Sequence, residues 1–362
     1  MKDYPYRLAT DQEAGPPSSR MVQGGRACFI KFFLKGLSFF YGLGVKAVLC
    51  CYEAGLLKRH RLPRPVISVG NITWGGVGKT PLVELIAGYL KEGKLKPVIL
   101  IRGYMPEGSS PFSDEAKVLQ ENLGDIPVVV GRNRWKTAQE ALNHHSVDAF
   151  ILDDGFQHWR IARGLDIVAV DTTNPFGNGH LIPRGILREP LEHLRRAHIF
   201  VLTKTDFGRA NLENIKLKLR KLNPEALIVE SVHQAVGLVD LCDPKRPVDL
   251  GLLRAMRVCA FCSIGDPESF KNMLSSLGAR VVCLVPFRDH YQYDEKDVRY
   301  VVDQGKAQGA VVFVTTPKDA VKLAGHLKFW QKGNGLFSLR IRLAITQGQQ
   351  EFYARISHLL ER

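Results

Sequence analysis

Short apolar runs alternate with helix-like segments along the first half of the chain. The strand-like runs lie at 65–69, 97–101, 126–130, 149–152, 166–170 and 198–202. Segments with helical spacing of their apolar residues separate most of them, at 81–90, 114–122 and 132–143. This alternation is typical of a parallel sheet whose two faces are both covered by helices.

The same pattern continues after a polar helical stretch at 210–222. Further strand-like runs lie at 227–231, 258–262, 280–285, 311–315 and 336–342. Helix-like segments follow them at 267–277, 294–308, 318–327 and 347–360. We therefore predict an α/β fold with two units, one at residues 61–206 and a second, smaller one at 207–362, joined between Phe207 and Gly251.

The N-terminal region has a different pattern. Residues 1–25 are polar and contain Pro and Gly, so we expect a flexible tail. Residues 26–60 contain an apolar stretch, Phe29–Leu57, which starts too late for a signal peptide. Three lysines interrupt this stretch, so it is a poor candidate for a membrane span.

A helical projection of this stretch gathers its polar residues on one side. At about 100° per residue, one sector of roughly 80° holds six positions, with apolar residues elsewhere: Lys31, Lys35, Ser38, Gly42, Lys46 and Glu53. We predict an amphipathic helix, or a pair kinked near Gly42 and Gly44, lying on a membrane with its lysines at the headgroups. A helix packed on the core of the protein is the alternative.

The net charge and the composition reduce the range of candidate binding partners only slightly. The 362 residues carry a formal net charge of +14, which favours polyanionic partners such as anionic lipids or phosphorylated substrates. No nucleic-acid-binding motif accompanies this charge, so we expect no nucleic-acid partner. The seven cysteines are scattered, which indicates reduced thiols in a cytosolic setting. We interpret Cys259 and Cys262 as two strand residues rather than a redox or zinc pair.

A glycine-rich segment between a strand and a helix carries the strongest functional signal. The run Val66–Thr80 passes from an apolar strand through glycines to Lys79 and Thr80. This order predicts a P-loop, in which backbone N–H groups and the start of the next helix bind phosphate. The first glycine of the usual pattern is replaced by Thr73. The predicted nucleotide-binding residues are Thr73, Trp74, Gly75, Gly76, Val77, Gly78, Lys79 and Thr80.

Two carboxylates at the end of another apolar strand predict the metal site. Asp153 and Asp154 follow the run 149–152, and ligands of open α/β sheets bind beyond the carboxyl ends of the strands. Either aspartate can therefore meet a Mg²⁺ ion that is also bound by the Thr80 hydroxyl. Solvated turn aspartates are the alternative. Gln157 and His158 follow closely and are candidates for contacting phosphate or a nucleophile.

Transfer of phosphate to an alcohol also needs a group that accepts the hydroxyl proton. Asp114 and Glu115 begin a predicted helix, and Asp289 precedes His290 after a strand of the second unit. A helix cap and a surface loop are the respective alternatives. Arg184 and Arg188 have forked guanidinium groups suited to phosphate, and a solvated basic loop is the alternative.

A further segment, Thr203–Asp206, is similar to the guanine-reading pattern of G proteins. In such a pattern Lys204 would lie over the base and Asp206 would accept hydrogen bonds from its edge. A match over four residues is a weak signal. It leaves open a membrane-associated nucleotide-dependent switch or NTPase as an alternative function.

Taken together, these segments resemble the tetraacyldisaccharide 4′-kinase family. The chain departs from the usual family pattern after Tyr104, where Met105 and Pro106 stand, and at Ala116, where the family commonly has proline. The matching segments keep the family order and are Val66–Pro81, Ile99–Tyr104, Ser113–Leu119, Ile151–His158, Leu181–Leu191, Phe287–Tyr291 and Thr315–Asp319.

The resemblance implies a P-loop NTPase-like domain, a second α/β domain and a membrane-associating N-terminal helix. It implies transfer of the γ-phosphate of ATP, with Mg²⁺, to the 4′-hydroxyl of a tetraacyldisaccharide 1-phosphate in lipid A biosynthesis. Asp114, assisted by His290, would be the base. Arg134, Arg188 and Glu189 would line the nucleotide or lipid-phosphate site.

The resemblance also implies a place in the cell. The enzyme would be peripheral or monotopic on the cytoplasmic face of the bacterial inner membrane, in contact with anionic lipids. The partners we expect are the lipid disaccharide substrate and this membrane surface, with no obligate protein partner.

Overall fold

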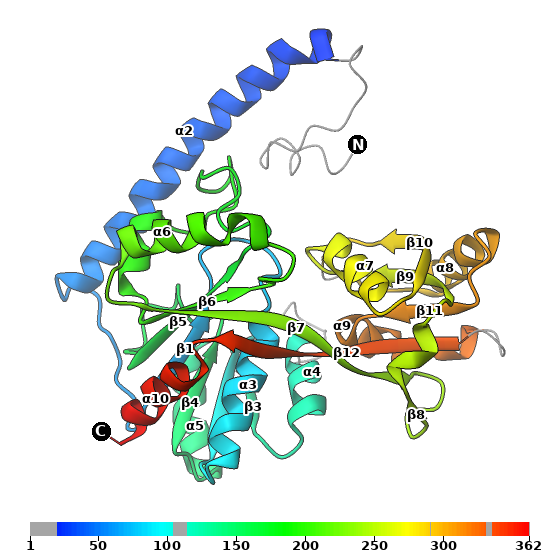
Figure 1. The fold of residues 1–362 in the computed structure, drawn as a ribbon. Helices are drawn as coiled ribbons and strands as arrows, with labels where there is room; N and C mark the ends of the chain where they lie inside the picture. The colour runs from blue at the N-terminus through cyan, green and yellow to red at the C-terminus, as the bar shows by residue number, and fades with distance from the viewer. Residues whose placement is uncertain (1–19, 104–113, 290, 331–334, 362) are drawn as a thin grey trace.

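The computed structural model describes residues 20–103, 114–289, 291–330 and 335–361 (Figure 1). Within this part of the chain all strands belong to one sheet, in the order β10-β9-β11-β12-β7-β6-β5-β1-β4-β2-β3, with β8 beside β7. The first strands are β1 (Val66–Gly70), β2 (Pro97–Arg102), β3 (Val128–Gly131), β4 (Ala149–Asp153), β5 (Leu165–Asp171) and β6 (Ile199–Thr203). The later strands are β7 (Leu227–Asp240), β8 (Pro247–Val248), β9 (Arg257–Cys262), β10 (Arg280–Pro286), β11 (Val312–Thr315) and β12 (Gly335–Gln347).

The helices match the predicted segments closely. They are α2 (Arg20–Glu53), α3 (Lys79–Glu92), α4 (Asp114–Leu123), α5 (Arg134–His144), α6 (Leu212–Leu222), α7 (Pro267–Ser276), α8 (Glu295–Ala307), α9 (Pro317–Leu323) and α10 (Gln349–Leu360). Short 3₁₀ turns complete the connections: η2 (Leu191–Arg196), η3 (Arg209–Asn211), η4 (Leu250–Leu253) and η5 (Ala324–Phe329).

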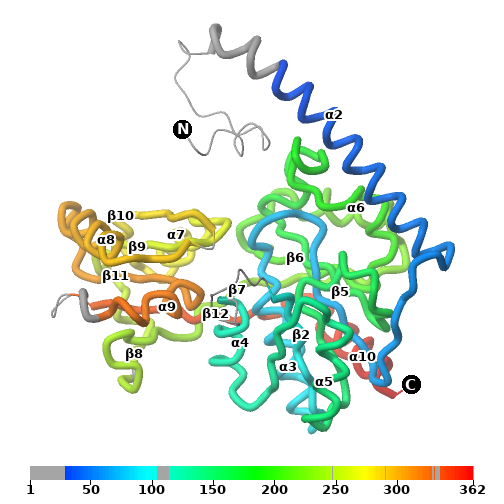
Figure 2. The backbone as a smooth tube through the Cα atoms, turned by 180° about the vertical axis from the view of Figure 1, so that it is seen from behind, coloured from blue at the N-terminus to red at the C-terminus, as the bar shows by residue number. Residues whose placement is uncertain are grey.

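The elements form two lobes joined by a pair of long strands. We call β1–β6 with α3–α6 and α10 the first lobe, and β8–β11 with α7–α9 the second lobe. Figures 1 and 2 show β7 and β12 running side by side between them. These two strands are antiparallel, and the short strand β8 also pairs antiparallel with β7. The expectation of a parallel sheet therefore holds for β1–β6 and for β9–β11 but is wrong for the connection and for β8. The reversal follows because β7 leads into the second lobe and β12 leads back out of it.

Helices on both faces explain the uninterrupted apolar strands of the first lobe. Every residue of β1 is buried. Ile67 and Val69 pack with α3 residues such as Leu82 and Ile86 on one face. The other face is covered in part by α5, where Ala138 packs with Phe150 of β4. Strands covered on both sides have no face on which to alternate with polar residues.

The position of the last helix shows that the predicted boundary between the two units, at residues 206 and 207, is too simple. We assigned all of 207–362 to the second unit, but α10 packs on the first lobe. Phe352 and Ile356 are fully buried in the same core cluster as Ile67. The correction arises because β12 carries the chain back across the junction, as both views show.

The N-terminal helix also differs from its prediction. It starts at Arg20 rather than after residue 25, and it runs unbroken through Gly42 and Gly44 to Glu53. The tail before residue 20 lies outside the described residues. Among those residues, the stretch Phe29–Glu53 is long and apolar enough to cross a membrane by length and composition alone. Only 17% of its most apolar part is buried, so it is not a core helix.

Two positions in the polar sector of α2 have a different role from the one we expected, whereas Lys35 and Lys46 of that sector are exposed. Ser38 and Gly42 do not face solvent but contact the first lobe. The Ser38 hydroxyl donates to the Leu181 carbonyl at 2.8 Å and accepts from the Arg184 amide at 3.0 Å. A Cβ atom on Gly42 would lie 2.7 Å from Leu181 Cδ1, so a glycine allows this close approach.

The packing of α10 predicts a large effect of a single substitution. Phe352→Ala removes a fully buried ring from the first-lobe core and should lower the free energy of unfolding by about 3–5 kcal/mol. The free energy of unfolding is measured by urea denaturation, monitored by circular dichroism. Tyr300→Ala, at a side chain that is 52% exposed on α8, is the control and should change it by less than about 0.5 kcal/mol. Equal midpoints for the two variants would contradict this packing.

Candidate active site

The predicted phosphate loop lies between β1 and α3, at the carboxyl end of the central strand. Gly78 precedes the first turn of α3 with φ of 84°, a left-handed conformation that disfavours residues with a Cβ atom. The Thr203 hydroxyl of β6 donates to the Val77 carbonyl at 3.0 Å and so ties the loop to the neighbouring part of the sheet. The start of the loop is paired with a second segment, since the Trp74 amide donates to the Ile186 carbonyl at 2.7 Å. The predicted residues 73–80 therefore form the loop that leads into α3 and the first two residues of that helix, Lys79 and Thr80.

The Lys79 ammonium group is held within the site by two oxygens. It donates to Asn71 Oδ1 at 2.9 Å and lies 3.3 Å from Asp154 Oδ1. Asn71 is fully buried at the end of β1. A lysine in this position can bind terminal phosphates as a point charge.

Arg188 joins the strand-end carboxylate to the phosphate loop. Its guanidinium group binds both oxygens of Asp154, at 2.7 and 2.8 Å. It also donates to Gln157 Oε1 at 2.9 Å and to Asn71 Oδ1 at 3.2 Å. The prediction that Arg188 and Gln157 lie near the phosphate loop agrees with this arrangement. The bidentate fork fixes the orientation of Asp154 more strongly than a single contact does.

Asp154 occupies an unusual backbone conformation. Its φ is 52°, a left-handed value that is uncommon for a residue with a side chain. Burial alone would raise its pKa, but the charges of Lys79 and Arg188 outweigh that effect and hold the pKa well below its usual value. Asp154 is therefore ionised throughout the physiological range.

Asp153 differs from its neighbour because one of its carboxylate oxygens has no hydrogen-bond partner. Its side chain is 6% exposed, and its Oδ1 atom is buried without a hydrogen-bond partner. Burial raises the pKa of Asp153 to about 6, and the charge of Lys79 opposes this shift. Arg134 donates to the backbone carbonyls of Asp153 and Asp154, at 2.5 and 3.1 Å. Arg134 thus fixes the end of β4.

The donor set at this strand end fits a magnesium ion. An unpartnered carboxylate oxygen of Asp153 and a hydroxyl on Thr80, in the first turn of α3, are hard oxygen ligands of the kind that Mg²⁺ prefers. The described residues contain no cluster of three or more His, Cys, Asp or Glu side chains suited to a metal. Mg²⁺ in phosphoryl-transfer sites needs no such cluster, because nucleotide phosphates and water supply most ligands.

Two other predicted site residues, His158 and Glu189, are largely buried within the protein. The pKa of His158 falls to about 4, first because of burial and then because of nearby arginines, so its imidazole is neutral at pH 7. Glu189 is 1% exposed and binds His193 at 2.7 Å and Arg196 at 2.9 Å. Its carboxylate is therefore committed to this buried cluster, which stabilises the loop that carries Arg188.

The predicted base lies at the start of α4, beside the end of β4. Asp114 and Glu115 form the first turn of this helix. The charge of Glu115 is close enough to contribute to the raised pKa of Asp153. His290, the predicted assistant, lies outside the described residues.

Lys204 has a different environment from a base-reading lysine. Its ammonium group lies 2.6 Å from Asp171 and 2.7 Å from Asp266, and its side chain is 5% exposed. Both carboxylates raise its pKa against the effect of burial. The lysine thus links the first lobe to the start of α7 in the second lobe.

The N-terminal helix reaches the same site through its polar side. The Tyr41 hydroxyl donates to the Arg188 carbonyl at 2.8 Å. The guanidinium group of that arginine binds Asp154. The N-terminal helix and the candidate phosphate site are therefore connected through one residue, Arg188.

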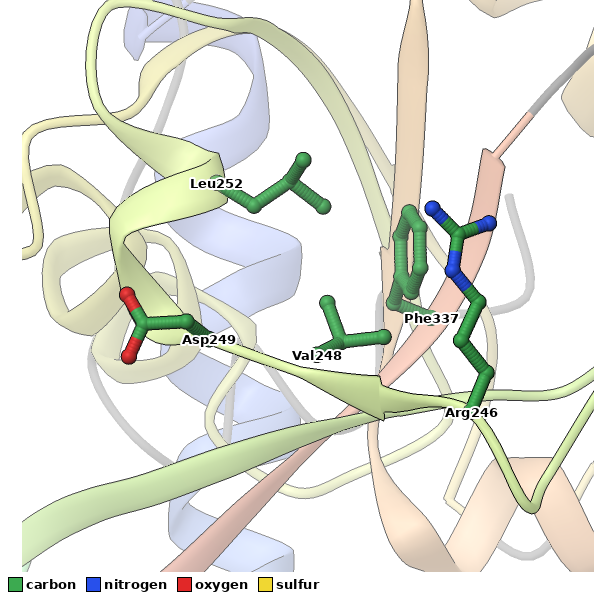
Figure 3. Close-up of a pocket in the computed structure, with 5 residues that line it drawn as sticks. All are labelled: Arg246, Val248, Asp249, Leu252 and Phe337. Carbon is green, nitrogen blue, oxygen red and sulfur yellow. The ribbon is translucent and has the colours of Figure 1, made fainter.

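A pocket of about 290 Å³ lies elsewhere, in the second lobe. Figure 3 shows the residues that line it, which come from β8, η4, β12 and the turn before β8: Arg246, Val248, Asp249, Leu252 and Phe337. It contains no part of the phosphate loop and none of the predicted site residues, so it is not the nucleotide site.

Sequence reasoning missed two residues that the fold brings into the site. Asn71 lies within the segment Val66–Thr80, and its position between the strand and the glycines could have indicated that it belongs to the site. Lys322 follows the matched segment Thr315–Asp319, and it lies 3.4 Å from Asp114. No local pattern indicated that contact.

Comparison with known proteins identifies the family. A family model described as tetraacyldisaccharide-1-P 4′-kinase matches residues 30–361. The tetraacyldisaccharide 4′-kinase of Syntrophus aciditrophicus (strain SB) is 40% identical over 314 residues, 80% of this chain and 84% of the relative. That of Halothermothrix orenii is 36% identical over 346 residues, 87% of this chain and 89% of the relative.

A solved structure has the same fold over most of the chain. It is described as the apo form of LpxK from Aquifex aeolicus in complex with ATP. The sequences are 28% identical, the TM-score is 0.70, and the match covers 91% of this chain and 99% of the other. With a family model that spans nearly the whole chain and relatives above 30% identity, the chain belongs to the tetraacyldisaccharide-1-P 4′-kinase family.

Proposed function

We propose that Asp114 accepts the hydroxyl proton when this ATP-dependent tetraacyldisaccharide 4′-kinase of lipid A biosynthesis phosphorylates its substrate. The observation that supports the proposal is the convergence of three features at one edge of the sheet. They are the phosphate loop after β1, the aspartates after β4, and the acidic start of α4 after β2. Since β1, β4 and β2 are neighbouring parallel strands, their carboxyl ends lie together.

In this mechanism the loop 73–80 holds the phosphates of ATP through backbone N–H groups, and Lys79 contacts the terminal phosphate. The related LpxK structure, which is described as a complex with ATP, supports ATP binding by this fold. Arg188 stands beside Lys79 and can stabilise charge on the transferred group once the nucleotide competes with Asp154 for it. Gln157 and Asn71 keep that arginine in place.

We assign the metal to Asp153 and Thr80. Asp153 has the unpartnered oxygen, whereas Asp154 already binds Arg188 and Lys79. A bound Mg²⁺ ion would neutralise charge on the phosphates. Asp154 then acts by orienting Lys79 and Arg188.

The acceptor is a lipid disaccharide, and α2 provides the surface by which we propose it is approached. The exposed apolar side of the helix suits the hydrocarbon boundary of a bilayer, and Lys35 and Lys46 are exposed where anionic headgroups can bind them. We place the enzyme on the cytoplasmic face of the inner membrane. The contact between Tyr41 and Arg188 would bring the lipid close to the phosphate loop.

The base assignment predicts a kinetic result. Asp114→Asn should lower kcat for transfer of labelled γ-phosphate to the tetraacyldisaccharide by about 10²–10⁴-fold, because proton transfer is lost. The affinity for ATP, measured by calorimetry, should stay within about twofold, because Asp114 is not a phosphate ligand. Asp303→Asn, an exposed carboxylate on α8, is the control and should leave kcat unchanged. A wild-type kcat in Asp114→Asn would refute the assignment.

The metal assignment predicts a change in magnesium dependence. Asp153→Asn and Thr80→Ala should each raise the Mg²⁺ concentration for half-maximal rate by at least about tenfold, because each removes an oxygen ligand. The measurement is a Mg²⁺ titration at fixed ATP, again with Asp303→Asn beside it. An unaltered titration in Asp153→Asn would show that this carboxylate does not bind the metal.

The membrane assignment predicts a change in partitioning. Replacing five exposed phenylalanines of α2 by serine should move the protein from the membrane to the soluble fraction, because each buried ring contributes about 1.5–3 kcal/mol. The five are Phe29, Phe32, Phe33, Phe39 and Phe40.

The control for this experiment is Tyr300→Ser with Val311→Ser, two exposed apolar residues of the second lobe. Both proteins are compared by flotation with vesicles that contain or lack anionic lipid. Equal partitioning of the two would exclude α2 as the membrane contact.

A further inference from the structure

The start of α9 is organised around a buried carboxylate that the reaction chemistry does not use. Asp319 is fully buried and accepts hydrogen bonds from the Ser263 amide at 3.0 Å, the Tyr293 hydroxyl at 3.1 Å and the Thr316 hydroxyl at 2.7 Å. The Ser263 hydroxyl donates to it as well. Thr316 also caps the helix, by accepting from the Asp319 amide. The helix is thus rigidly fixed to the loop after β9.

Lys322 lies one turn further along α9 and faces out of the second lobe. Its side chain is only 1% exposed. The ammonium group donates to the Ser263 hydroxyl at 2.7 Å and lies 3.5 Å from Asp319. Its third neighbour is Asp114, in the first lobe, at 3.4 Å. A lysine is rarely buried unless its charge is paired, and here one of its partners belongs to the other lobe.

A second lysine on the same face of α9 makes a parallel contact. Lys318 lies four residues earlier, so both side chains project from one side of the helix. Its ammonium group lies 3.0 Å from Glu115 and 3.1 Å from Asp289. Two lysines of α9 therefore face two successive acidic residues of α4.

We propose that Lys322 is a positioning residue for Asp114. The second lobe, through the fixed start of α9, holds the acidic first turn of α4 at the phosphate site. This gives a role to the segment Thr315–Asp319, which no step of the phosphate transfer uses directly. The inference rests on the proposed function of Asp114 as the base.

The physical reason is the narrow geometry of proton transfer. A base must lie within hydrogen-bond distance of the hydroxyl it deprotonates, and a displacement of about 1 Å can lower a rate by about 100-fold. An ion pair with a buried partner is screened little by salt and is a firm restraint. Since α9 is anchored through Asp319, Lys322 transmits the position of the second lobe to Asp114.

The test compares Lys322→Met with Lys322→Arg. Lys322→Met should lower kcat by about 10- to 100-fold with the KM for ATP within about twofold, because phosphate binding stays intact. Lys322→Arg keeps the charge and should restore most of the rate. Lys296→Met, at an exposed lysine of α8, is the matched control and should behave as wild type. ATP binding by calorimetry and the thermal melting curve show that each variant is folded.

A double-mutant cycle separates positioning from a merely structural role. If Lys322 acts through Asp114, then Lys322→Met should lower the residual rate of Asp114→Asn by less than about threefold. A structural defect would lower both backgrounds equally.

Three outcomes would overturn the inference. Equal losses in the two backgrounds, with Asp114→Asn itself slow, overturn the positioning role and leave the base assignment intact. An unchanged or increased kcat in Lys322→Met does the same. A wild-type kcat in Asp114→Asn overturns the base assignment and the inference together.

Discussion

The charge cluster around Asp154 is the interaction on which the active site depends. One carboxylate, held in a left-handed backbone conformation at the end of β4, binds Lys79 from the phosphate loop and Arg188 from a distant loop. The two cations would repel each other without it. The neighbouring Asp153 takes no part in these ion pairs and has an unpartnered oxygen, which we propose as the metal ligand.

Two ion pairs help to fix the position of the second lobe. Lys204 of the first lobe binds Asp266, and Lys322 of the second lobe binds Asp114. The strands β7 and β12 join the lobes through one continuous sheet. The second lobe therefore contacts the first lobe at two separate places, one of which is the helix that carries the proposed base.

The N-terminal helix is connected to the same site. Two of its polar residues contact the first lobe: Ser38 binds the loop at Leu181, and Tyr41 binds the carbonyl of Arg188. The apolar side is left exposed. A single helix thus leaves an apolar face exposed, where we propose the bilayer contact, and binds with its other face the loop that carries Arg188.

The sequence by itself determined the parallel strands, the helices between them, the phosphate loop and the strand-end aspartates. These depend on local spacing, which neighbouring residues encode through hydrophobic periodicity and glycine conformation. Only the tertiary structure decided that α10 packs on the first lobe, that Glu189 is buried with Arg196, and that Lys322 meets Asp114. Such contacts join residues far apart in the chain. They form because the long strands β7 and β12 carry the backbone from one lobe to the other and back. No local sequence pattern indicates which distant residues then meet.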